Sequence, residues 1–441
     1  MRSTTFTFLI TIGCLLLGSC SIKSHSVNKR KIKKQFEQSQ ISNDHFTGFA
    51  LYDMDEKKMV FELNSDKYFT PASNTKLFTF YTCLKMLGDS IPALRYEVHS
   101  DSLVFWGTGD PSFLHSDLKG VKGLKFLQRS DKNIYWSTTG YTGGFFGPGW
   151  AWDDYNDDYQ QELNAFPIED NEVLLYADSD GNMQVKPNYF KRFLTRDPDF
   201  KPTAFKVQRN FLTNQFVYPQ TDIPKKFTQL VPWKTSDIIT KALLEDTLKK
   251  PVYLTQMPMS SKAKVIYNAN ADSVYRRMLQ PSDNFIAGQL LLVCSSVKFN
   301  MLNTDSVIAY SKKYFLNDLP DEPQWADGSG LSRYNLFTPR SIVKLLCKIS
   351  DEMKNDSLLH SLMPIGGVAG TIKNAYKTDK GKPFVWAKTG SLSNNHNQSG
   401  YLITRKGKRL AFSFMNNNFT RPAKDIRNEM VRVITWIHEA Y

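Results

Sequence analysis

Three short motifs stand in order along this chain, and they constrain its fold more than any other feature. The first is S-x-x-K at residues 73–76, the second is S-D-N at 282–284, and the third is K-T-G at 388–390. The surrounding apolar spacing predicts that they lie at a helix start, in a turn between two helices and on a strand. A fold that unites them must bring three distant parts of the chain to one site.

Between the first and second motifs the character of the sequence changes. Residues 96–262 hold short apolar runs, many aromatics, and Gly, Pro and Asp between the runs, which indicates a mostly β insertion with one helix at 236–250. We expect a catalytic domain of α/β (α+β) class, formed by residues 46–95 and 263–441 and interrupted by that insertion.

Local patterns predict the elements of the catalytic domain. Strands are expected as hairpins at 46–63 and 399–415 and as a single strand at 385–390. The expected helices are 73–88, 272–279 (capped by Asp272), 284–297, 339–349 and a C-terminal helix whose apolar face spans 426–437.

The chemistry of an activated serine explains the first two motifs. A serine attacks poorly unless a base takes its proton, and residues three apart share a helix face, so Lys76 is expected beside Ser73. Burial and a second cation, Lys388, would lower the pKa of Lys76 enough for it to act as that base. Ser282 can relay a proton, and the amide of Asn284 can hold the backbone of a peptide substrate.

The third motif offers groups that bind the substrate. Lys388 and Thr389 present a cation and a hydroxyl to a free C-terminal carboxylate. Gly390 is expected to let the substrate pack closely against the strand edge. The next backbone N–H, at Ser391, can then face the oxyanion of the reaction intermediate.

The motif set is that of class A β-lactamases and penicillin-binding proteins. Over nearly the whole mature chain, the sequence resembles the class C low-molecular-mass penicillin-binding proteins, which are serine D-alanyl-D-alanine carboxypeptidases and endopeptidases. Five further stretches carry this likeness: FTPAS at 69–73, GTGDP at 107–111, GPGWAWDD at 147–154, DGSGLSR at 327–333 and GTI at 370–372.

The resemblance implies a transpeptidase/β-lactamase-like domain with an antiparallel sheet flanked by helices. It implies a serine DD-peptidase that cleaves peptidoglycan stem peptides through an acyl-enzyme, binds β-lactam antibiotics and needs no cofactor. It also adds Asp154, which would meet the free amine of the stem peptide, and Arg333 and Leu392, which would line the pocket. For Asp154, an exposed acidic loop remains an equal alternative. The same loop is not a calcium site, because Tyr159 stands where an EF-hand needs glycine, so no metal is expected.

Two other functions share some of these features. A class A β-lactamase would need an E-x-x-L-N string between the second and third motifs, and none is present, so a penicilloyl-enzyme should hydrolyse slowly. A non-catalytic lipoprotein that binds peptidoglycan or β-lactams would not need intact motifs. The balance between carboxypeptidase and endopeptidase activity stays open, as does the preferred third-position residue of the stem peptide.

The first twenty residues indicate export. Arg2 precedes a short apolar run at 6–17, and residues 17–20 (LGSC) resemble a bacterial lipobox. We expect a signal peptide at 1–19, a lipidated Cys20, and a tether with a first helix at 20–45. The protein would then be anchored at the periplasmic face of a bacterial membrane.

The charge of the chain has more than one reading. The net charge of +13 indicates either anionic partners or a basic surface that is only solvated. The basic run at 29–34 indicates either contact with anionic lipid or a solvated helix face. Because the protein is expected to be exported, nucleic acid is excluded as a partner.

Overall fold

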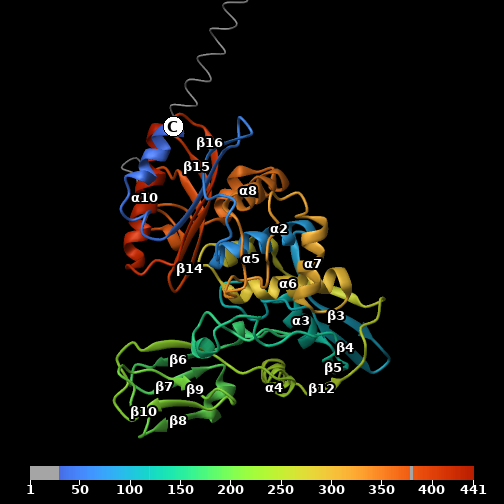
Figure 1. Cartoon of the computed structure of the whole chain (residues 1–441). Helices are drawn as coiled ribbons and strands as arrows, with labels where there is room; N and C mark the ends of the chain where they lie inside the picture. The colour runs from blue at the N-terminus through green and yellow to red at the C-terminus, as the bar shows by residue number, and fades with distance from the viewer. Residues whose placement is uncertain (1–28, 119, 378–380) are drawn as a thin grey trace, which may run out of the picture.

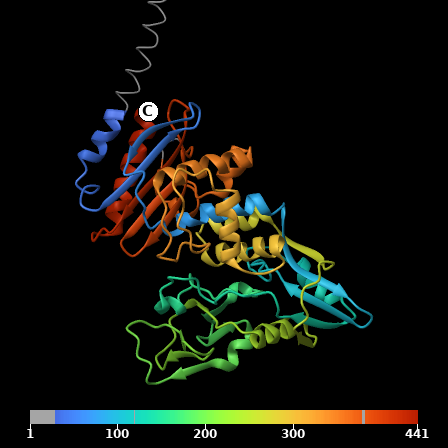
Figure 2. The same cartoon turned by 45° about the vertical axis from the view of Figure 1, so that its right-hand side comes forward.

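The structure is a computed structural model that describes residues 29–118, 120–377 and 381–441. Two portions are visible: a sheet with its helices, which carries both ends of the described chain, and a second portion built from the middle of the chain (Figures 1 and 2). The catalytic motifs belong to the first portion, and the second lies against its helical side.

The first portion contains an antiparallel sheet with strand order β14-β15-β16-β1-β2. N-terminal and C-terminal segments meet in its middle, where Phe46 of β1 pairs with Asn417 of β16. The two predicted hairpins and the predicted single strand are all present, so the local alternation of apolar residues was informative. The strands are β1 (Phe46–Asp53), β2 (Lys58–Leu63), β14 (Val385–Leu392), β15 (Asn395–Ile403) and β16 (Arg409–Asn417).

Helices cover both faces of this sheet. Phe49 and Leu51 of β1 point to the face covered by α10 (Ala423–Ala440) and by the helix at 29–37, whereas Ala50 between them packs toward α8 (Pro339–Met353). This alternation buries both faces, which is why the central strands have so few exposed residues. An antiparallel sheet flanked by helices confirms the predicted α/β (α+β) class.

The remaining helices of this portion pack as a layer against α8. α6 is buried along almost its whole length and contacts α2, α5 and α7. Its burial on all sides explains why its sequence is apolar without a polar face. The helices are α2 (Lys76–Met86), α5 (Ala271–Leu279), α6 (Asn284–Phe299), α7 (Thr304–Tyr314) and α9 (Asp356–Leu362).

One predicted helix cap is wrong. The sequence suggested Asp272 as the cap of α5, but the Asn270 side chain is the cap and accepts the Ser273 N–H at 3.3 Å. The preceding strand runs to Asn270 and passes directly into the helix. Asp272 therefore lies inside the first turn, where its charge still suits the positive end of the helix dipole.

Among its described residues, the second portion contains three sheets and two α-helices, α3 (Lys122–Arg129) and α4 (Asp237–Leu248). α4 agrees with the helix expected at 236–250. The largest sheet has the order β12-β5-β4-β3-β13, and the other two have the orders β11-β6-β7 and β8-β10-β9. The strands are β3 (Ser90–Val98), β4 (Ser102–Gly107), β5 (Asn133–Ser137), β6 (Glu172–Ala177), β7 (Met183–Lys186), β8 (Leu194–Asp197), β9 (Gln208–Arg209), β10 (Phe216–Pro219), β11 (Thr228–Pro232), β12 (Val252–Thr255) and β13 (Lys264–Asn270).

The chain enters and leaves this portion through β3 and β13, which pair with each other. The portion bounded by these two strands therefore covers residues 90–270, whereas the insertion was expected at 96–262. The boundary between the two portions is not evident in the sequence, because β3 follows α2 after a short connection and starts with an apolar run.

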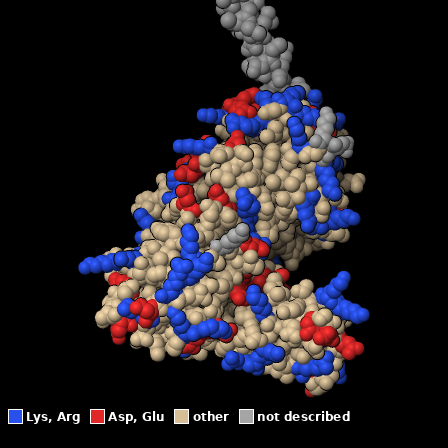
Figure 3. All heavy atoms as spheres, turned by 180° about the vertical axis from the view of Figure 1, so that it is seen from behind, with Lys and Arg blue, Asp and Glu red and all other residues tan. Residues whose placement is uncertain are grey.

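No helix in the described part of the chain is long and apolar enough to cross a membrane. Cys20 and the expected signal peptide lie outside the described residues. On the face shown in Figure 3, Lys and Arg are distributed over both portions with Asp and Glu among them. On that face the positive charge forms no single large patch.

Candidate active site

Ser73 and Lys76 lie where a tight turn becomes a helix. Ser73 is in the 3-10 turn η1 (Ala72–Thr75), and Lys76 is the first residue of α2. The Lys76 side chain is fully buried, and its Nζ lies 2.9 Å from Ser73 Oγ, 2.6 Å from Asn284 Oδ1 and 2.7 Å from the Ser329 carbonyl oxygen. The structure therefore places the lysine beside the serine, as the spacing predicted.

Burial gives Lys76 the property that a base requires. It lowers the pKa of Lys76 from 10.5 to about 7, although Asp327 and Asp283 act in the opposite direction. The sequence had assigned part of this shift to Lys388. In the structure burial lowers the pKa of both lysines, and the repulsion between them further lowers the pKa of Lys388.

Asp327 is a positioning residue whose role the sequence did not suggest. Its buried carboxylate accepts hydrogen bonds from Ser329 Oγ at 2.7 Å, from the Gly330 N–H at 2.9 Å and from Trp150 Nε1 at 2.8 Å. These bonds fix the loop whose Ser329 carbonyl binds Lys76. The DGSGLSR stretch marked this loop in the sequence, but no local pattern shows which atoms it holds.

Ser282 and Lys388 form a second hydrogen-bonded pair. Lys388 Nζ donates to Ser282 Oγ at 2.8 Å and to the Thr389 carbonyl oxygen at 2.6 Å, and its side chain is fully buried. Burial and the nearby Lys76 hold the pKa of Lys388 well below its usual value. Ser282 itself has a φ of +73°, a conformation that costs a non-glycine residue energy and directs its hydroxyl into the site.

The Asn284 side chain connects the two portions of the molecule. Its Oδ1 accepts from Lys76, and its Nδ2 donates to the Tyr159 carbonyl oxygen at 2.9 Å. Both ends of the amide are occupied in this structure, so its orientation is fixed. A direct grip on the substrate backbone, expected from the sequence, would require the Tyr159 contact to be exchanged or shared.

Gly390 has a structural role that the sequence did not suggest, and close packing of the substrate there stays a prediction. A Cβ added at this position would lie 2.4 Å from the Pro71 carbonyl oxygen and 2.9 Å from the backbone nitrogens of Ser73 and Asn74. The absent side chain thus makes room for the nucleophile turn η1 of the protein itself. This close approach sets the distance between β14 and Ser73.

Gly390→Ala is therefore expected to push η1 away from β14. We expect acylation by penicillin to slow at least about tenfold, since small displacements at a reacting centre are costly, and stability to fall by about 1–3 kcal/mol. Stopped-flow acylation and thermal unfolding measure both. The matched control is Gly88→Ala, where an added Cβ meets nothing within 4 Å. If Gly390→Ala behaves like the control, the close packing is not required.

The backbone of β14 offers an N–H to the site. The Ala387 N–H donates to the Pro364 carbonyl oxygen, which lies on the side of the strand away from β15. Because backbone directions alternate along an antiparallel strand, the N–H of Ser391 points to that same outer edge. Together with the Ser73 N–H, which lies next to Gly390, it can bind an oxyanion.

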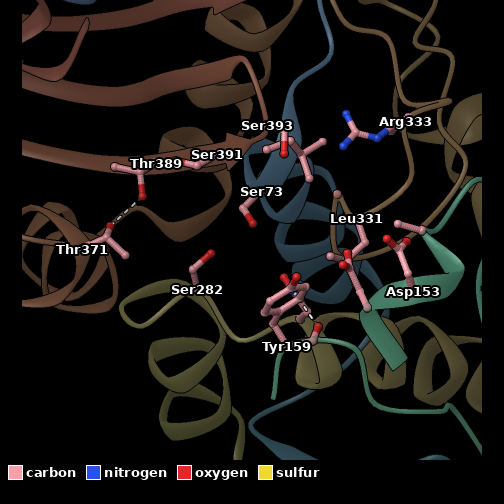
Figure 4. A pocket seen from close by; sticks show the side chains of 15 residues that line it. Ser73, Asp153, Tyr159, Ser282, Leu331, Arg333, Thr371, Thr389, Ser391 and Ser393 are labelled. Carbon is pink, nitrogen blue, oxygen red and sulfur yellow. Dashed lines mark hydrogen bonds between the residues drawn. The ribbon is translucent and has the colours of Figure 1, made fainter. Parts of the chain in front are cut away.

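A cavity of about 540 Å³ opens in front of Ser73 (Figure 4). Thr371 and Thr389, whose hydroxyls are 2.7 Å apart, lie on one side of Ser73, and Asp153 and Arg333 lie on the other. The lining residues are Ser73, Ala151, Asp153, Asp154, Tyr159, Ser282, Asn284, Gly330, Leu331, Arg333, Thr371, Thr389, Ser391, Leu392 and Ser393.

The lining contains Asp154, Arg333 and Leu392, so the structure brings these three sequence candidates to one cavity. Burial raises the pKa of Asp154, as do Asp157 and Asp153, while Tyr159 and Arg333 lower it. The sequence did not identify Tyr159 or Leu331 as lining residues. No motif marks them as binding groups, although Leu331 falls within one of the family-like stretches.

Lys388 does not line the cavity. The sequence predicted a direct bond from its ammonium to a substrate carboxylate, but Ser282 and the Thr389 carbonyl enclose its Nζ. A direct bond from Lys388 to a substrate carboxylate therefore stays a prediction, and it would require these contacts to be exchanged or shared. The hydroxyls of Thr389 and Thr371 are the groups that the structure presents at this end of the cavity. Among the described residues, no group of three His, Cys, Asp or Glu side chains is placed to hold a metal ion.

Comparison with known proteins gives consistent matches. The family model described as D-Ala-D-Ala carboxypeptidase 3 (S13) matches residues 28–437. D-alanyl-D-alanine carboxypeptidase DacB of Haemophilus influenzae is 24% identical over 433 residues, which cover 85% of each chain. A D-alanyl-D-alanine carboxypeptidase of Actinomadura sp. (strain R39) is 38% identical over 102 residues, 22% of this chain and 19% of that one.

A solved structure shows the same fold. The crystal structure of penicillin binding protein 4 (dacB) from Haemophilus influenzae superimposes with a TM-score of 0.72 at 19% identity, covering 93% of this chain and 99% of that one. At this identity the likeness shows the fold, and its coverage includes both portions of the molecule.

Proposed function

This chain belongs to the D-Ala-D-Ala carboxypeptidase 3 (S13) family, and from that premise we propose how it acts as a serine DD-peptidase. Ser73 attacks the carbonyl of the D-alanyl-D-alanine bond in a peptidoglycan stem peptide and forms an acyl-enzyme. Penicillin acylates the same serine. The observation that carries this proposal is the contact of a fully buried Lys76 with Ser73 Oγ at 2.9 Å, with the pKa of that lysine lowered to about 7.

Acylation uses two proton transfers. Neutral Lys76 Nζ takes the proton of Ser73 Oγ as the new C–O bond forms, and the N–H groups of Ser73 and Ser391 hold the resulting oxyanion. When the C–N bond breaks, that proton passes from Lys76 through the hydroxyl of Ser282, which Lys388 Nζ holds in place, to the leaving D-alanine amine. Lys76 is then neutral again and takes a proton from the water that attacks the acyl-enzyme, and it returns this proton to Ser73 Oγ as the shortened peptide leaves.

The two ends of the cavity can bind two different parts of such a substrate, its terminal carboxylate and its third-position side chain. The terminal carboxylate would accept hydrogen bonds from the Thr389 and Thr371 hydroxyls. The third-position side chain would extend toward Asp154 and Arg333, where an amine and a carboxylate each find an opposite charge. Leu392 would pack against its methylene groups.

We propose both carboxypeptidase and endopeptidase activity, because a D-alanyl cross-link presents the same acyl donor to Ser73. Digestion of purified peptidoglycan, read by mass spectrometry, separates them. Loss of terminal D-alanine reports the first activity, and conversion of cross-linked dimers to monomers reports the second. A digest with no dimer cleavage would limit the enzyme to carboxypeptidase action.

The decisive test combines fluorescent-penicillin labelling with an assay of D-alanine release from a pentapeptide. We expect a stable covalent label and release of D-alanine. Labelling without release would indicate a β-lactam-binding protein without peptidase activity. Rapid loss of the label with hydrolysis of the antibiotic would indicate a β-lactamase instead.

The pH dependence follows from the lowered pKa of Lys76. A lysine must be neutral to accept a proton, so acylation should reach its plateau above pH 7 and fall about tenfold per pH unit below it. The rate of penicillin acylation between pH 5 and 9 measures this, with thermal unfolding at each pH as the control for folding. A rate that stays constant from pH 5 to 8 would exclude Lys76 as the base.

We also propose a lipid anchor at Cys20 and an exported location. The support is the signal-like sequence of residues 1–20 and the position of the helix at 29–37 (blue), which lies at the end of the molecule opposite the insertion (Figure 1). An anchor there would let the cavity and insertion extend away from a membrane. Metabolic labelling with palmitate should mark the protein, and Cys20→Ala should remove the label and release the protein into the soluble fraction.

A further inference from the structure

Exposed apolar side chains gather beside the catalytic cavity. Trp152 and Leu212 are 70% and 71% exposed, and Phe211 is 40% exposed. The Phe211 ring packs edge-on against Trp152 and Tyr155, with centroids 6.1 Å and 4.9 Å apart. We call Trp152, Tyr155, Phe211 and Leu212 the aromatic platform. Large apolar groups left in water together in this way usually mark a binding surface.

The platform is held in place by a buried arginine. Arg209 is 1% exposed, and its guanidinium donates to the carbonyl oxygens of Pro232, Asn210 and Tyr155 at 2.8, 2.9 and 3.4 Å. The Arg209 backbone N–H also donates to Asn156 Oδ1 at 2.8 Å. These bonds tie the loop that carries Phe211 to the turn that carries Trp152. The apolar side chains are therefore presented on a fixed backbone, which lowers the entropy lost on binding.

The platform and the cavity share one element. The 3-10 turn η2 (Trp152–Asn156) carries Trp152 and Tyr155 of the platform, and it also carries Asp153 and Asp154, which line the cavity. A ligand that fills the Asp154 end of the cavity therefore lies against the same turn that carries Trp152 and Tyr155.

The direction of the substrate identifies that ligand. With its terminal carboxylate at Thr389 and its scissile carbonyl at Ser73, a stem peptide runs its N-terminal part toward Asp153, on the opposite side of Ser73 (Figure 4). In peptidoglycan this N-terminal end is joined to the glycan strand. The C–H faces of sugar rings are apolar and carry slight positive charge, which suits the electron-rich faces of Trp and Tyr.

We propose that the aromatic platform binds the amino-sugar glycan strand that carries the stem peptide in the cavity. This inference rests on the proposed DD-peptidase function and specifies its substrate as glycan-linked peptide. Trp152 supplies the main stacking surface, and Phe211 and Leu212 extend it.

The test compares substrates with and without sugar. For Trp152→Ala and for Leu212→Ser, we expect kcat/KM for D-alanine release from a disaccharide-pentapeptide to fall about 5- to 20-fold, the usual effect of removing an anchoring side chain. Release from the free pentapeptide and acylation by penicillin should stay within twofold of the unsubstituted chain. Tyr314→Ala, which removes a 55% exposed aromatic on α7, is the control and should change neither.

Each outcome bears on the proposal. Equal loss on both substrates would mean that the variants disturb η2 and the cavity, and would overturn glycan binding. Unchanged activity on the disaccharide-pentapeptide would overturn it as well. Leu212 lies outside η2, so its variant separates a lost contact from a distorted cavity. Failure of the DD-peptidase function itself would appear differently, as no D-alanine release from the free pentapeptide by the unsubstituted chain.

Discussion

Ser73→Ala is expected to abolish covalent penicillin labelling and to lower D-alanine release by at least about 10³-fold, because the nucleophile itself is removed. The fold should remain intact. The Ser73 side chain faces the cavity, and Lys76 keeps its contacts with Asn284 Oδ1 and the Ser329 carbonyl oxygen. Gel fluorescence with labelled penicillin and a D-alanine assay measure the loss, and circular dichroism with thermal unfolding checks the fold.

A second serine of the cavity gives the control for that experiment. Ser393 lines the same cavity but has no lysine three residues later, so Ser393→Ala should keep labelling within a few-fold of the unsubstituted chain. Labelling of Ser73→Ala at the normal rate would show that another residue is acylated. The assignment of the nucleophile would then be wrong.

Lys388→Ala is expected to lower kcat/KM about 30- to 1000-fold, because it removes a buried hydrogen-bond partner of Ser282 and costs about 2–4 kcal/mol in a secluded site. The structure also predicts that this loss does not depend on the C-terminal carboxylate of the substrate. Since Lys388 bonds to Ser282 and does not line the cavity, a pentapeptide and its C-terminally amidated form should lose activity by the same factor.

Thr389→Val is the matched variant for this comparison. Its hydroxyl lines the cavity, so its loss should weaken the pentapeptide with a free carboxylate more than the amidated one. In Lys388→Ala, the fall in the acylation rate below pH 7 should persist, because burial lowers the pKa of Lys76. A selective loss on the free carboxylate in Lys388→Ala would instead restore the direct contact that the sequence suggested.

Local sequence patterns determined much of the architecture. The alternation at 46–63 and 399–415 specified two hairpins, and the apolar face around 426–437 specified the helix that covers them. The three motifs were equally informative, since each lies on the type of element that was expected for it. Such features depend on residues close in sequence, whose periodicity is set by the geometry of a strand or a helix.

Contacts between distant segments decided the details of the site. Asp327 fixes the loop that binds Lys76, and the Tyr159 carbonyl occupies the amide of Asn284. Gly390 makes room for the nucleophile turn, which is 317 positions earlier at Ser73. No periodic pattern relates such residues, because their proximity arises only when β14, η1 and the turn before α6 pack together.

The sequence by itself determined the three motifs, their elements and the acylation chemistry they permit, because residue type and local spacing fix these. Only the tertiary structure decided that Lys388 holds the hydroxyl of Ser282 and which groups line the cavity. Burial, which lowers the pKa of Lys76 to about 7, is a property of the packed molecule. A side chain is removed from water by residues from many segments at once, and no single segment of the chain encodes that environment.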